Sequence, residues 1–215
     1  MFAYKTVDFQ GMELIFGLGT STYGMFKNAN VKGIGKISNT DHITDAAFMF
    51  KDATVDTFPE EMSFKKLSDA TCMFENTVVE HDGIKKLSIP SVNSTKCMFK
   101  NSNVLGTGDT VDLKTVLGEN WIANIENISY MFGGFKRKIK FGTENLDAKK
   151  VNSAYNAFDS TEIVDSDEIT ILIGENCIST HSMFYNTKSL KNISAINIAS
   201  IDCDCTAMFA GSELT

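Results

Sequence analysis

The sequence has no run of about 18 apolar residues, which is roughly the length a helix needs to cross a membrane. Residues 1–19 contain one lysine, two acidic residues and no long apolar core, so they do not form a signal peptide. The chain also lacks an excess of basic residues, and its net charge is −7. Because a nucleic-acid backbone is bound by clustered cations, this charge disfavours a nucleic-acid partner.

Cysteine and arginine are scarce as well. The five cysteines are an odd number in a chain without a signal peptide, which indicates reduced thiols. Arg137 is the only arginine, and it lies in the one basic run, Lys136-Arg137-Lys138 followed by Lys140. We interpret this run as a solvated loop, and the alternative is a site for phosphate or for an acidic partner.

What the sequence does contain is a repeated doublet. Met-Phe recurs at intervals of 24 to 26 residues, with one interval of 33, and Ala157-Phe158 fills the one gap. The doublets begin at Met25, Met49, Met73, Met98, Met131, Met183 and Met208. A fixed period of about 20–50 residues predicts a stacked-repeat architecture, so the 215 residues are expected to form one elongated domain.

Each doublet is bracketed by short polar residues. The residue four before the Met, or before Ala157, is a helix N-cap type in every repeat: Ser21, Asp45, Asp69, Ser94, Asn127, Ser153, Ser179 and Asp204. The residue two after the Phe is in most repeats one that tolerates the left-handed conformation: Asn28, Asp52, Asn76, Asn101, Gly134, Ser160, Asn186 and Gly211. Each motif is therefore predicted to be a cap, one short helical or 3₁₀ turn, and a stop.

Branched aliphatic residues follow each stop, which predicts a strand leading to the next cap. Five residues after the Phe stand Val31, Val55, Val79, Val104, Ile163 and Leu214, with Ile139 and Leu190 slipped. The predicted fold is an α/β repeat solenoid, a leucine-rich-repeat-like stack of short strands and short helical or 3₁₀ turns with about eight rungs.

The solenoid is predicted to span residues 1–215 in four stretches. Residues 1–19 form an N-terminal rung with a strand or hairpin, and residues 20–109 form regular repeats. Residues 110–130 belong to the repeat with an insertion, where 110–113 resembles a strand and 114–127 has helical spacing. Trp121 is expected to pack this insertion onto the stack. Residues 131–215 form later repeats without a C-terminal cap, and such an end exposes Phe209 and a strand edge.

Two parts of the sequence resemble a known family. Ile84-x-x-Leu87-x-Ile89-Pro90 followed by Cys97-Met-Phe99 resembles a leucine-rich repeat of the BspA type. The Met-Phe-x-Asn/Asp units with Ser or Asp four residues earlier resemble lipoprotein-associated repeats of bacterial surface proteins and phage structural proteins. The resemblance extends over roughly 20–214, and it implies a scaffold for adhesion or protein interaction. The chain departs from the surface members because it lacks a leader or anchor.

Several residues could in principle carry chemistry, but each has a structural interpretation that we prefer. Cys72 and Cys97 precede the motif Met in adjacent repeats, within reach of a disulfide, and are interpreted as small buried fillers. Cys177, His181, Cys203 and Cys205 are a possible zinc set, but the Cys-x-Cys spacing argues against it. Acidic residues 165–168 and the Gly-x-Gly segments 17–19 and 106–108 are interpreted as turns. No cofactor, metal or catalytic residue is therefore predicted.

These observations favour a non-enzymatic scaffold that binds protein partners. The candidate contact residues are Ser63, Ser88, Asp112, Asn197 and Trp121. The chain is expected to be made in the cytoplasm and to be built into a larger assembly such as a phage virion, with subunits of that assembly meeting its open C-terminal end. The alternatives are a bacterial cell-surface adhesin module and, less favoured, the repeat support domain of an enzyme.

Overall fold

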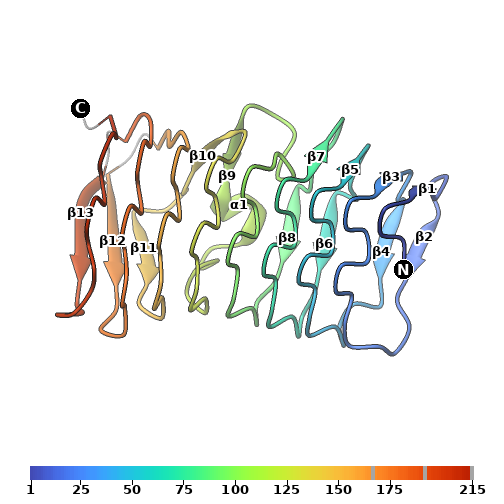
Figure 1. Cartoon of the computed structure of the whole chain (residues 1–215), viewed down its shortest axis with the longest axis horizontal. Coiled ribbons are helices and arrows are strands. Elements are labelled where there is room, and N and C mark those ends of the chain that lie inside the picture. The colour runs from blue at the N-terminus through green and yellow to red at the C-terminus, as the bar shows by residue number, and fades with distance from the viewer. Residues whose placement is uncertain (166–167, 191–192, 214–215) are drawn as a thin grey trace.

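The computed structural model describes residues 1–165, 168–190 and 193–213. These residues form a β-solenoid in which the chain winds through about eight coils, and the two termini lie at opposite ends of the stack (Figure 1). The eight predicted cap residues form one continuous column of parallel bridges along the stack, from Ser21 to Asp204. We number the coils 1 to 8 by these residues, so that coil 1 begins at Ser21 and coil 8 at Asp204.

The Met-Phe turn is not helical, and here the prediction is wrong. In coil 1 the amides of Thr22, Gly24, Phe26 and Asn28 donate to carbonyls of coil 2. The amides between them donate within coil 1, Tyr23 to the Ser21 hydroxyl and Met25 and Lys27 to the carbonyl three residues back. A helix would direct all of its amides along its own axis, so it could not bond to the next coil in this way. Six of the eight cap residues accept from the amide two residues on, as Asp45 Oδ1 does from Ala47 at 2.9 Å.

The predicted stop positions are confirmed. All eight residues two after the motif Phe have positive φ, between 50° and 73°, and five of them are Asn or Asp and two are Gly. A second column also has positive φ, immediately before the motif Met, and it includes Phe48, Cys72 and Tyr130. Each turn therefore has two left-handed residues, with three residues between them, and the chain changes direction at both.

One set of parallel strands follows the turns. Its first sheet has the order β1-β3-β5-β7 and is followed along the stack by the pair β9–β10. The strands are β1 (Thr6–Asp8), β3 (Asn30–Lys32), β5 (Thr54–Val55), β7 (Val78–Val79), β9 (Thr110–Asp112) and β10 (Lys138–Lys140). The inward residues Val31, Val55 and Val79 are buried, as the periodicity predicts, whereas Leu214 lies outside the described residues.

A second set of parallel strands forms another side of the coils (Figure 1). It contains β2 (Glu13–Ile15), β4 (Lys36–Ser38), β6 (Glu61–Ser63), β8 (Lys86–Ser88), β11 (Asn145–Ala148), β12 (Ile169–Ile173) and β13 (Ile193–Ile198). β1 pairs with β3 and β2 with β4, so residues 1–19 contribute one strand to each side instead of a hairpin. Surface ion pairs such as Lys36–Glu13, at 3.2 Å, join neighbouring coils on this side.

Coil 4 contains the insertion. Its one helix, α1 (Leu113–Leu117), begins at Asp112, whose Oδ1 accepts from the Thr115 amide at 2.9 Å, and contacts β8. The predicted helical segment 114–127 is therefore much shorter, because Gly118 follows at φ 102°. Trp121 is buried and meets the Phe132 ring edge-on, with 6.0 Å between the ring centroids, so it packs the insertion onto the stack as predicted.

Within the described ranges, no helix has the length and apolar character that crossing a membrane requires.

The motif phenylalanines form one ladder through the core. Consecutive rings stack at 4.9–5.8 Å between centroids with interplanar angles of 5–23°, and Phe2 adds a ring before Phe26. Rings outside the ladder, including Phe58 and Phe141, meet it edge-on. This ladder and the neighbouring column of methionines account for the recurrence of Met-Phe in the sequence.

Phe74 has ladder neighbours on both sides, so Phe74→Ala should leave a cavity. We expect it to lower the free energy of unfolding by about 3–5 kcal/mol, measured by urea denaturation. Tyr185→Ala is the control, because this aromatic lies one residue after a motif Phe but is 39% exposed. A loss below about 1 kcal/mol for Phe74→Ala would show that the ladder is not a tight core.

Asn28 tests the left-handed stop in isolation. It has φ 55°, it is exposed, and its side chain has no hydrogen bond among the described residues. Asn28→Val should cost about 1–2 kcal/mol of stability, because a β-branched residue is strained at positive φ. Asn28→Gly should change stability by less than about 0.5 kcal/mol. Equal stability of the two variants in urea denaturation would contradict the assigned backbone conformation.

Candidate functional site

The basic run lies where the regular hydrogen bonding between coils is interrupted. In coil 2 the amides of Thr54 and Asp56 donate to Ala29 and Val31, which are two residues apart. In coil 5 the amides of Lys136 and Lys138 instead donate to Ser102 and Asp109 of coil 4, which are seven residues apart. The extra residues of coil 4 therefore bulge outward before β9, and a groove opens beside them.

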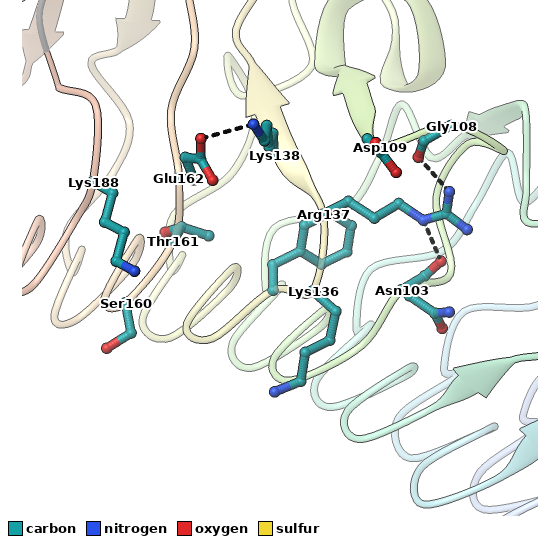
Figure 2. Close-up of a pocket in the computed structure, with 11 residues that line it drawn as sticks. Asn103, Gly108, Asp109, Lys136, Arg137, Lys138, Ser160, Thr161, Glu162 and Lys188 are labelled. Atoms are coloured by element: carbon teal, nitrogen blue, oxygen red, sulfur yellow. Dashed lines mark hydrogen bonds and ion pairs between the residues drawn. The ribbon is translucent and has the colours of Figure 1, made fainter.

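We call this hollow the basic groove. It encloses about 520 Å³ and draws its lining from four successive coils. The lining residues are Asn103, Gly108 and Asp109 of coil 4, Phe135, Lys136, Arg137 and Lys138 of coil 5, Ser160, Thr161 and Glu162 of coil 6, and Lys188 of coil 7. Figure 2 shows Lys188 and Ser160 on one side of the groove and Arg137 reaching toward the coil 4 bulge on the other.

Arg137 is the structural cation of the basic groove. Its Nε donates to the Asn103 carbonyl at 3.1 Å and its Nη1 donates to the Gly108 carbonyl (Figure 2). Burial lowers the pKa of the guanidinium and Asp109 opposes that shift, but arginine stays charged at any physiological pH. Arg137 thus ties the outward bulge to the edge of coil 4, a role that requires donors in a fixed planar fork.

The lysines of the groove differ in their partners. Lys138 Nζ lies 3.1 Å from Glu162 Oε1, and both side chains are partly exposed. Lys136 and Lys188 are exposed, and neither ammonium has an ion pair or hydrogen bond with any residue in the described part of the chain. Four cations thus face two carboxylates, and two of the cations have no partner within the described ranges. The sequence-based interpretation as a solvated loop missed this groove, although the single Arg and the 33-residue interval both marked the place.

The basic groove suits several separated negative charges better than one compact anion. Lys136 and Lys188 stand two coils apart, on the order of 10 Å at the usual strand spacing. Carboxylates on alternate residues of an extended peptide recur at about 6.6 Å, so two or three of them can reach both lysines. Each exposed pair contributes only about 0.2–1 kcal/mol, so binding here would be weak and sensitive to salt.

Among the sequence-predicted contact residues, Ser88 lies beside Ser63, and it also lines a cleft of about 200 Å³ together with Trp121. Ser63 of β6 and Ser88 of β8 are direct register partners on the outer side of their sheet. Ser63 is exposed and Ser88 is half-buried, and the neighbouring Glu61 and Lys86 approach each other to 3.8 Å. This face is therefore polar and paired within itself.

The other three predicted contact residues lie apart from one another. Asp112 caps α1, and Trp121 is 9% exposed, so its side chain acts as a packing residue. Asn197 is exposed on β13, at the edge of its sheet. It borders a shallow cleft of about 760 Å³ that is also lined by Leu172, Ile196 and Ile198.

The possible zinc set is not assembled around one point. The His181 ring stacks on Tyr155 at 5.0 Å, and its Nδ1 lies 3.5 Å from Asp204. Among residues that the structure describes, no three His, Cys, Asp or Glu side chains are arranged to hold a metal ion.

The acidic segment 165–168 is described only in part, and the Asp165 carboxylate accepts hydrogen bonds from the amides of Phe141 and Gly142. Burial raises the pKa of Asp165 in spite of these hydrogen bonds.

Comparison with known protein families gives one match. The family model described as "Mycoplasma protein of unknown function, DUF285" matches residues 20–111 and 107–215. The first match begins at the first coil, and the two matches overlap within the coil 4 insertion. No curated protein and no solved structure matches the chain.

Proposed function

We propose, from the premise that this chain belongs to the DUF285 family, that it is a non-enzymatic scaffold for protein–protein interaction and a component of a larger assembly. The observation that carries the proposal is the basic groove, where the repeat departs from its own pattern and two lysines have no partner among the residues that the structure describes. The stack behind it supports a binding role, because a continuous aromatic core holds four successive coils in fixed register.

The partner is an acidic segment of another protein. The chain has a net charge of −7, so a cluster of four cations stands out against the remaining surface. Opposite charge favours encounter, and the 520 Å³ hollow gives an extended peptide a place to lie.

The open edge of β13 supports the assembly part of the proposal. Ile196 and Ile198 are half-buried there, whereas their register partners on β12, Ile171 and Ile173, are almost fully buried. A strand edge with such residues is a template for pairing with another strand. We assign this edge to a neighbouring subunit of the same assembly. That the assembly is a virion stays a prediction from the sequence resemblance.

The basic groove is tested with a fluorescein-labelled octaglutamate peptide, followed by fluorescence anisotropy at low salt. The double variant Lys136→Gln/Lys188→Gln should bind about two- to thirty-fold more weakly, because two charge pairs are lost. Raising the salt concentration to 0.5 M should weaken binding to the unaltered chain in the same direction.

The matched control removes two other exposed lysines, Lys66→Gln/Lys96→Gln, which lie outside the groove. It should change the peptide affinity less than twofold. Equal losses in the two double variants would show that binding follows net charge alone and would contradict a site in the groove. Displacement of the peptide by millimolar inorganic phosphate would identify a phosphate site instead.

Assembly through β13 is tested by native mass spectrometry at increasing protein concentration. We expect dimers or larger species that are reduced by Asn197→Lys, because a charge on an edge strand blocks pairing. Ser63→Lys is the control. It adds the same charge at an exposed position of β6, a strand that pairs with β8 inside the stack. A chain that is monomeric at every concentration would contradict this contact.

A further inference from the structure

Three cysteine sulfurs lie together where coil 6 passes into coil 7 and, in the next layer, coil 7 passes into coil 8. Cys203 Sγ lies 3.3 Å from Cys177 Sγ, and Cys205 Sγ accepts from the Thr180 hydroxyl at 3.3 Å. The same Thr180 oxygen lies 3.7 Å from Cys203 Sγ. Cys177 belongs to the buried apolar column before the cap residues, whereas Cys203 is displaced by one residue from the equivalent place in the next coil.

The backbone brings these two cysteines close together although their places in the repeat differ by one residue. The residues that follow them, Ile178 and Asp204, are joined by a hydrogen bond from the Asp204 amide to the Ile178 carbonyl at 3.0 Å. Neighbouring parallel strands lie about 4.8 Å apart, which is within the range of Cα separations that disulfides span. The two sulfurs need to approach by only about 1.3 Å to reach bonding distance.

The three thiols differ in exposure, and this gives them different roles. Cys177 is 1% exposed, Cys203 is half-buried and Cys205 is exposed. Burial, together with the neighbouring Cys203 thiol, raises the pKa of Cys177 to about 12. A buried thiol of this kind is a poor first nucleophile, so reaction with a molecule from solution begins at one of the other two. Of these, Cys203 is the thiol that lies 3.3 Å from the Cys177 sulfur and can pass the bond on to it.

We propose that Cys177 and Cys203 form a reversible disulfide when the protein meets a small-molecule disulfide. The Cys203 thiolate attacks one sulfur of the small disulfide, a mixed disulfide forms, and one small thiolate leaves. The Cys177 sulfur then attacks Cys203 Sγ, its proton passes to the departing small thiolate, and the protein disulfide is complete. Overall, two protein thiols are oxidised and the small disulfide is reduced to two thiols.

The consequence is a covalent ring around coil 7. The bond links the end of coil 6 to the end of coil 7, next to the half-buried β13 edge. Closing a loop of this kind restricts the unfolded chain, so oxidation should raise the Tm of the protein by about 5–10 °C. The last coils would thus be more firmly attached to the stack under oxidising conditions than under reducing ones.

The test treats the reduced chain with oxidised glutathione and measures free thiols, intact mass and linked peptides. We expect a loss of two thiols, a mass decrease of about 2 Da and the Tm increase given above. Cleavage after lysine separates Cys177 from Cys203 but leaves Cys203 and Cys205 on one peptide. Variants must therefore decide which of these two is linked to Cys177.

Cys203→Ser should abolish the link to Cys177, whereas Cys205→Ser and Cys72→Ser should keep it. The proposal is overturned if Cys205→Ser loses the link, if oxidation joins Cys203 to Cys205, or if glutathione remains attached to Cys203 without a second step. It is equally overturned if all five thiols stay free. Circular dichroism of each variant in its reduced form shows whether the stack is intact before oxidation.

Discussion

The solenoid depends on the alternating use of backbone amides in the Met-Phe turn. Every second amide donates to the next coil and the others donate back within the same coil, so each turn is fixed to its neighbour as it is formed. Coils joined in this way repeat at the strand spacing, and the motif rings consequently stack at 4.9–5.8 Å. The recurrence of Phe, Met and the short polar residues follows from this one constraint, because each must occupy the same place in every coil.

The regular hydrogen bonding between coils restricts which residue types can occupy the repeated positions. Both candidate sites lie where that regular pattern is interrupted. The extra residues of coil 4 displace the partner of Lys138 from the expected carbonyl to Asp109, and the basic groove lies beside that displacement. Cys203 stands one place out of the apolar column and thereby meets Cys177. Irregular positions can hold charged or thiol side chains because those side chains do not have to continue a stacked column.

A feature of this fold could be predicted from the sequence when it depends mainly on the residue's own chemistry. The left-handed stops were predictable because Asn, Asp and Gly tolerate positive φ through their own chemistry. The helical turn was wrongly predicted because N-cap residues also favour tight turns, in which they accept a hydrogen bond two residues on. Phe48 and Tyr130 have no intrinsic preference for positive φ, so their conformation is imposed by hydrogen bonds to neighbouring coils.

The sequence by itself determined the period, the number of coils, the stacked phenylalanines and the burial of the aliphatic residue after the stops of coils 1 to 7. These features depend on spacing along the chain, and spacing is what a sequence records. Only the tertiary structure decided that Lys188 joins Lys136 across two coils and that Cys203 meets Cys177. Those contacts join residues many positions apart, and small offsets in register, which arise from insertions and slips, determine which side chains meet.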